Sequence, residues 1–198
     1  MHRLEALIDG IYAFAMTLLI LSFDIPKLMK GTGSAGLESL ILSQSDRFFN
    51  YFLSFMLLAV FWLVNQQIFH HIKHTDTKHI WFNVVTMMFV VFIPYSTSLV
   101  SEFPDLTAGE FFFALNIFLV SMMGQLGWLY ATHRRRLVTE ESKDEHLRSS
   151  LMSGWVAPFV AVISMVVAFI KPVVCSYLYL SIPLILAVMG VIIKKRAR

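Results

Sequence analysis

The stretch RLEALIDGIYAFAMTLLILSF, residues 3–23, decides the class of fold to which this chain belongs. Most of its side chains are apolar, and it is long enough to cross the hydrocarbon of a bilayer, which takes about 20 helical residues. Arg3, Glu5 and Asp9 stand at its start. Charges at the edge of a membrane are costly, so they usually serve a purpose. We therefore expect a membrane-spanning first helix with a polar beginning.

The rest of the chain repeats this apolar character. Hydrophobic residues make up 57% of the 198 residues and charged residues only 15%, against roughly 25% charged residues in a typical soluble domain. The first run lacks the short apolar core and the cleavage site of a signal peptide, so we expect it to be retained. We predict an all-α integral membrane protein, a single domain over residues 1–198 with six transmembrane helices. Apolar runs of bilayer-spanning length occur near 5–26, 47–69, 79–100, 110–132, 151–170 and 173–193.

The distribution of lysine and arginine predicts the orientation, because basic residues near the ends of spans are enriched on the cytoplasmic side. Twelve of the 16 basic residues fall on the side of the two termini, which we therefore expect to be cytoplasmic. The RRR cluster at 134–136 is better explained by contact with anionic lipid headgroups than by binding to nucleic acid. The twelve are Arg3, Lys73, Lys78, Arg134, Arg135, Arg136, Lys143, Arg148, Lys194, Lys195, Arg196 and Arg198.

The opposite side carries more acidic than basic residues. A negative outer face concentrates cations at a pore mouth, although ordinary solvated loops explain the same composition. The acidic residues on this side are Asp24, Glu38, Asp46, Glu102, Asp105 and Glu110.

The first helix has two faces of different character. At 100° per residue an apolar stripe forms with Thr17 at its edge, and a face of small residues runs beside it. Small residues let helices approach closely in lipid. Such a helix either lines the central axis of a symmetric oligomer or packs both faces within one subunit. The stripe consists of Leu7, Ile11, Phe14, Leu18, Leu21 and Ile25, and the small face of Ala6, Gly10, Ala13 and Thr17.

Arg3 and Asp9 do not pair with each other, because six residues separate them and place them about 240° apart around the helix. Their partners are expected on other helices, since charges removed from water must be satisfied. The segment Asn65–Gln67 near the end of the second span lies at a comparable depth, as does the histidine group that follows it. We predict a polar network that joins these helices on the cytoplasmic side.

Signatures of enzyme chemistry are absent from the sequence. It has no phosphate-binding loop, no HExxH and no carboxylate pair at bilayer depth, so we expect neither catalysis nor a cofactor. His70 and His74 lie one helical turn apart, but a position at a helix end explains them better than a metal site. A sensor of pH remains an alternative for these histidines. No TVGYG-like filter is present, which excludes a potassium channel of the pore-loop kind.

Several of these residues resemble a known family. Arg3 followed by Asp9-Gly10, then Ala13 and Ala15–Leu19, with Phe61-Trp62, Phe92–Pro94 and Thr97 later, is similar to the prokaryotic members of the transmembrane protein 175 family, relatives of the lysosomal potassium channel. Leu7 and Ile8 depart from the family's Phe-Ser pair. Asn65–Gln67 likewise stand where relatives often have a pair of histidines. The resemblance covers nearly the whole chain and matches the expected six spans.

The resemblance implies a homotetramer whose first helices surround the pore. Carried over residue by residue, it places the narrowest apolar ring at Phe14, further apolar positions at Leu18 and Leu21, and a threonine layer at Thr17. Arg3 and Asp9 take the place of the family's structural motif. Phenylalanine at the ring, where relatives mostly have isoleucine or leucine, narrows the pore further.

The sequence and the resemblance together favour a passive, potassium-preferring cation channel in the plasma membrane of a prokaryote. Its partners are then potassium and other monovalent cations, the lipid bilayer and further copies of the chain. A proton-conducting pathway or a secondary transporter is the alternative, and it needs a titratable group within the membrane, for which only Asp9 qualifies. A non-conducting structural protein is the third hypothesis.

Overall fold

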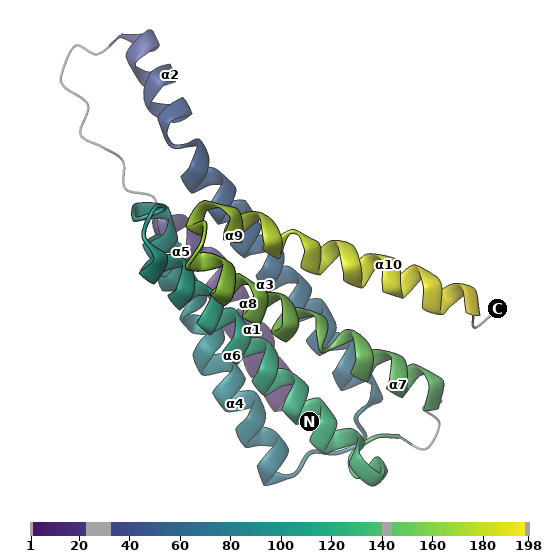
Figure 1. Cartoon of the computed structure of the whole chain (residues 1–198). Coiled ribbons are helices and arrows are strands. Elements are labelled where there is room, and N and C mark those ends of the chain that lie inside the picture. Colours follow the sequence, from purple (N-terminus) through teal and green to yellow (C-terminus); the bar gives the residue numbers. More distant parts are fainter. Residues whose placement is uncertain (1, 23–32, 140–143, 197–198) are drawn as a thin grey trace.

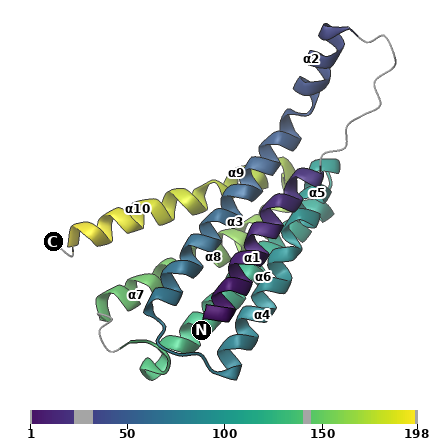
Figure 2. The same cartoon turned by 180° about the vertical axis from the view of Figure 1, so that it is seen from behind.

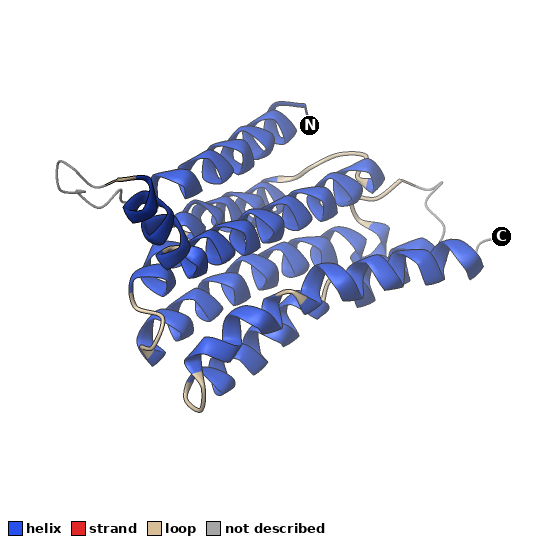
Figure 3. Cartoon of the chain, turned by 90° about the horizontal axis from the view of Figure 1, so that it is seen from above, coloured by secondary structure: helices blue, strands red, loops and turns tan. Residues whose placement is uncertain are grey.

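A computed structural model describes residues 2–22, 33–139 and 144–196, and these residues fold as helices joined by short connections. Six of the helical segments are long and apolar enough to cross a membrane, which confirms the predicted count. They extend over His2–Leu21, Ser45–His71, Thr77–Glu102, Thr107–Arg135, His146–Ala168 and Pro172–Gly190. Figure 3, a view from above, shows these helices packed side by side with α1 (His2–Leu18) at one edge.

Three of the spans are broken in the middle, and proline explains each break. A proline ring clashes with the carbonyl four residues before it and donates no backbone hydrogen bond. The third span accordingly divides into α4 (Thr77–Val91) and α5 (Ile93–Glu102) beside Pro94. The fifth divides into α7 (Asp144–Ser153) and α8 (Val156–Ala168) ahead of Pro158, and the sixth into α9 (Pro172–Tyr179) and α10 (Ser181–Arg196) ahead of Pro183.

The long helix α6 (Thr107–Thr132) is the centre of the bundle. It packs against α4, α5 and α8, and α1 packs against α3 (Ser45–His71), α4 and α5. Figure 1 shows α10 leaving the bundle at an angle, and α2 (Ser34–Ser43) continuing the line of α3 beyond it. The view from behind in Figure 2 shows α1 at the front, with no other helix of the subunit covering it.

The end of the bundle near residue 2 is closed by the segment that follows α6. Arg134 and Arg135 have positive φ angles of 54° and 52°, so the chain turns back sharply after η2 (His133–Arg135). Lys73 then donates its backbone N–H to Leu137 at 2.8 Å, and Thr139 donates to His71 at 3.0 Å. These bonds hold the end of α3 and the segment that follows α6 together.

Candidate functional site

The first helix divides into a packed face and an open face. Ile8, Tyr12, Ala15 and Leu19 are at most 3% exposed and belong to the main hydrophobic core. They recur every three or four residues, as one face of an α-helix requires. The face in contact with the rest of the subunit is therefore not the one that carries the apolar stripe predicted from the sequence.

The predicted stripe lies on the open face of α1. Leu7 is 50% exposed, Phe14 55% and Leu21 73%, whereas Leu18 is half-buried and Ile11, also half-buried, packs against the core of the subunit. The small residues Ala6, Gly10 and Ala13 are exposed too, and a Cβ added at Gly10 would meet no atom within 4 Å. Packing within one subunit, one of the two alternatives left by the sequence, therefore does not account for these faces. Ile25, the last residue of the stripe, lies outside the described residues.

The sequence predicted a membrane span near residues 5–26, and within the described part of this span the α-helix ends at Leu18. It continues as the 3₁₀-helix η1 (Leu19–Ser22). Residues three apart eclipse one another in a 3₁₀-helix, whereas an α-helix rotates them by about 60°. The tighter winding keeps Leu21 close to the line of Leu18, so the stripe continues past the end of α1.

Thr17 is exposed beside this stripe, and its hydroxyl donates a hydrogen bond of 2.8 Å to the carbonyl of Phe14. Because the hydroxyl proton is committed to the backbone, the oxygen lone pairs remain available to a cation or to water. This arrangement orients the oxygen as an acceptor.

Asp9 has the partners that the sequence placed on the second span. Gln66 donates its side-chain amide to Asp9 Oδ1 at 2.6 Å, and Trp62 donates its indole N–H to the same oxygen at 2.9 Å. The sequence suggested Gln66 but missed Trp62, because an aromatic residue in an apolar run is read as part of the packing. Arg3 is exposed and does not contact Asp9 in this network.

The acidic residues of the predicted outer side behave differently from one another. Arg47 pairs with Glu102 at 2.9 Å across α3 and α5. Glu110 is only 1% exposed and accepts a hydrogen bond from Ser176 at 3.1 Å. The expectation that Glu110 belongs to a solvated negative face is therefore wrong, because the first turn of α6 is covered by α9. Asp24 lies outside the described residues.

The histidines that follow the second span form no metal centre within the described part of the chain. No group of three or more His, Cys, Asp or Glu side chains there is arranged to hold a metal ion. His70 and His71 contact each other edge to face, with ring centroids 5.6 Å apart, and His71 also lies near Trp128.

Six helices of membrane-spanning length define a polytopic membrane protein. Its first helix has apolar and small residues that the rest of the subunit does not cover. The model of a protein family described as the endosomal/lysosomal potassium channel TMEM175 matches residues 3–94, which include this helix and the Asp9 network. A potassium channel of Chamaesiphon minutus is 29% identical over 147 residues, which cover 73% of this chain and 71% of the relative. Over residues 3–94 the chain therefore matches the TMEM175 family, the resemblance that its first helix predicted. That family is described as an ion channel.

Other relatives are matched over less of their length. A potassium channel of Streptomyces collinus is 31% identical over 101 residues, or 51% of this chain and 48% of the relative. The human endosomal/lysosomal proton channel TMEM175 is 29% identical over 91 residues, and the chain covers 18% of it.

Solved structures agree with the fold. The crystal structure of a lysosomal potassium-selective channel TMEM175 homologue from Chamaesiphon minutus superimposes with a TM-score of 0.81 at 22% identity, covering 94% of this chain and 96% of that one. The potassium channel MtTMEM175 superimposes with a TM-score of 0.67 at 17% identity, covering 98% of this chain and 93% of that chain.

Proposed function

We propose that this protein is a passive, potassium-preferring cation channel of the cell membrane, built as a homotetramer with α1 of each subunit around the pore. The observation that carries the proposal is the open face of α1. A single subunit leaves Leu7, Phe14 and Leu21 exposed beside small residues, and close helix approach in lipid uses small residues of this kind. The names of the bacterial relatives support potassium as the ion.

Phe14 forms the narrowest ring of this pore, with Leu18 and Leu21 continuing the apolar lining. Apolar rings offer a cation no oxygen ligands and gate conduction by excluding water. Thr17 supplies the nearest oxygen, and its bond to the Phe14 carbonyl leaves the lone pairs free for an ion. Phe14 is therefore proposed to limit the flow of cations, and Thr17 to select K⁺ over Na⁺.

The test is cation flux through liposomes that contain the purified protein. Phe14→Ala is expected to raise flux several-fold and to weaken the preference for K⁺ over Na⁺, because a smaller ring lets the pore stay wet. Thr17→Val keeps the shape but removes the hydroxyl, so it should lower the preference for K⁺ and leave assembly intact.

Leu63→Ala is the matched control, because Leu63 on α3 is 50% exposed, much like Phe14, but does not belong to α1. If neither α1 substitution changes the cation flux or the preference for K⁺ while the tetramer stays intact, α1 does not line the permeation path.

Proton conduction is the second candidate, and the name of the human relative supports it. Asp9 is the acidic residue of α1 nearest to Phe14 along the chain, and its Oδ1 accepts from two neutral donors. A pH-sensitive dye inside the same liposomes, at equal K⁺ on both sides, separates the two functions. A proton flux that Asp9→Asn abolishes, in the absence of K⁺ flux, would replace the potassium proposal. A saturable flux that requires a second solute would indicate a transporter.

A further inference from the structure

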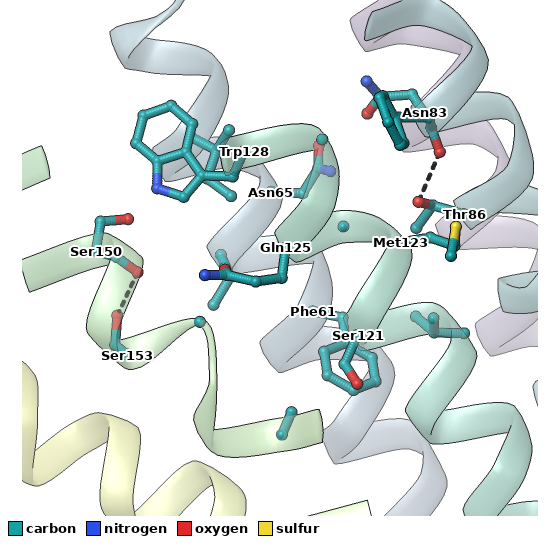
Figure 4. Close-up of a pocket in the computed structure, with 18 of the residues that line it drawn as sticks. Phe61, Asn65, Asn83, Thr86, Ser121, Met123, Gln125, Trp128, Ser150 and Ser153 are labelled. Atoms are coloured by element: carbon teal, nitrogen blue, oxygen red, sulfur yellow. Dashed lines mark hydrogen bonds between the residues drawn. The ribbon is translucent and has the colours of Figure 1, made fainter. Parts of the chain in front are cut away.

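A cavity of about 80 Å³ lies behind α1, on the side of its packed face. It is lined by residues of α1, α3, α4, α6 and α7, with single residues from α8 and α10. Tyr12, from the packed face of α1, is one of its walls. Figure 4 shows that the labelled side chains around it come from several different helices.

The lining combines hydrogen-bonding groups with an apolar floor and carries no formal positive or negative side chain. Its described residues include no Asp, Glu, Lys or Arg. The polar side chains are Tyr12, Asn65, His79, Asn83, Thr86, Ser121, Gln125, Trp128, Ser150 and Ser153. Apolar contacts come from residues such as Phe61, Val64 and Val120. An ion in such a site would lack a counter-charge, so the chemistry favours an uncharged occupant.

Two of the lining residues have buried polar atoms without a partner among the described protein atoms. His79 is 2% exposed and Trp128 1% exposed, and neither His79 Nδ1 nor Trp128 Nε1 has a hydrogen bond. Figure 4 shows the indole nitrogen on the edge of the Trp128 ring turned toward Ser150 and Gln125. Buried polar groups are nearly always hydrogen-bonded, so unpartnered ones beside a cavity point to an occupant.

Both unpartnered atoms are donors. An indole N–H only donates, and the amide nitrogen of Asn83, which also only donates, lies 3.4 Å from His79 Nε2. His79 Nε2 therefore acts as the acceptor, which leaves the proton on Nδ1. An occupant that satisfies either N–H group must supply oxygen lone pairs.

The helical backbone is interrupted at the wall of the cavity. In the last turn of α7 the carbonyl of Leu151 accepts a bond of 2.9 Å from the side-chain amide of Gln125. A Cβ on Gly154 would come within 1.9 Å of Gln125 Oε1, so the glycine leaves room for this side chain. Non-helical backbone at membrane depth is tolerated where it is buried in protein or lines a cavity. The break between α7 and α8 lies at such a place.

We propose that this cavity is a binding site for a small uncharged molecule with an oxygen acceptor and a short apolar part, the chemistry of a short-chain alcohol. The oxygen accepts from Trp128 Nε1, and the apolar part packs against apolar lining side chains such as Phe61, Val64 and Val120. The occupant also contacts Tyr12, so it touches α1 from the side opposite Phe14.

The probe is azibutanol, a photoreactive four-carbon alcohol, applied to the whole protein in liposomes and followed by mass spectrometry of the adducts. We expect adducts on cavity residues, with excess butanol competing for them. Gly124→Leu should remove most of these adducts, because Gly124 lines the cavity and a Cβ there meets no atom within 4 Å, so leucine fills the space without displacing the helix. Trp128→Phe keeps the ring but deletes the donor, and should lower the yield several-fold.

Gly190→Leu is the matched control, since Gly190 is exposed on α10 and also has open space at its Cβ. It should leave the adducts unchanged. Adducts confined to lipid-facing residues such as Phe159, or cavity adducts that persist in a folded Gly124→Leu protein, would overturn the proposal. Oxidation of Trp128 by hydroxyl radicals without azibutanol adducts would also overturn it, because the cavity would then hold water alone. None of these readouts depends on ion flux.

Discussion

Asp9 is held by two neutral donors from α3 and not by a cation. Asp9→Ala leaves the Trp62 indole and the Gln66 amide without their acceptor, and an unsatisfied buried donor costs about 1–3 kcal/mol. Because Asp9 is only half-buried, we expect a loss at the lower end of this range. Thermal unfolding in detergent and recovery of the assembled protein measure the effect.

Gln67→Ala is a suitable control for this prediction, because Gln67 is the exposed neighbour of Gln66 on the same helix. Equal stability of the Asp9→Ala and Gln67→Ala proteins would show that the network contributes nothing. The sequence pointed to Gln66 through its depth in the membrane, but not to Trp62. Periodicity reports which face of a helix is apolar, and it does not reveal an indole N–H that reaches across to a neighbour.

Asp76 is the N-cap residue of α4, and its contribution to stability depends on pH. Its Oδ1 accepts from the backbone of His79 at 2.9 Å, and its Oδ2 accepts from the Tyr130 hydroxyl at 2.6 Å. The Tyr130 hydrogen bond, more than the backbone bond, holds the pKa of the Asp76 carboxyl below its ordinary value in the folded chain. The carboxylate's contribution to stability is therefore complete above the unfolded pKa of about 3.9, and it is lost as the pH falls through the folded pKa.

Unfolding measured between neutral and acidic pH tests this cap. We expect Asp76→Asn to retain most of the capping but to lose the part of the acid sensitivity that Asp76 causes, because asparagine also caps helices but does not titrate. Tyr130→Phe should reduce the same acid dependence by removing the main cause of the lowered pKa. If the wild type and Asp76→Asn lose stability in parallel, Asp76 is not the titrating group.

At the scale of helices, the sequence predicted the six spans but not their breaks. Apolar runs show where the chain enters the hydrocarbon, and Pro94, Pro158 and Pro183 inside those runs determine where the helices divide. The break before Pro158 also contains Gly154. A side chain at this position would collide with Gln125 of α6, so the position requires glycine. A contact between distant segments leaves no local signal in the sequence. The cavity beside this break was for the same reason not predictable.

Gly154→Ala tests that contact directly. The added methyl group would lie 1.9 Å from Gln125 Oε1, so we expect the melting temperature to fall by several degrees. Removing the obstructing side chain as well, in Gly154→Ala with Gln125→Ala, should recover part of the loss. Gly190→Ala has open space and should be neutral or slightly stabilising, since alanine favours a helix by about 0.5–1 kcal/mol over glycine. A Gly154→Ala protein as stable as Gly190→Ala would contradict the role of this contact.

At the scale of the whole molecule, the orientation in the membrane follows from charge and can be tested without a functional assay. The predicted cytoplasmic end holds Arg134–Arg136, and the predicted outer end holds α2, where Glu38 is exposed. Glu38→Cys should react with an impermeant maleimide added to intact cells, whereas Arg134→Cys should react only after the membrane is opened. The native Cys175 is fully buried, so the wild-type protein supplies a low background. The reverse pattern would mean that the basic residues do not set the orientation of this chain, and the open face of α1 would then present Thr17 toward the cytoplasmic rather than the outer half of the pore.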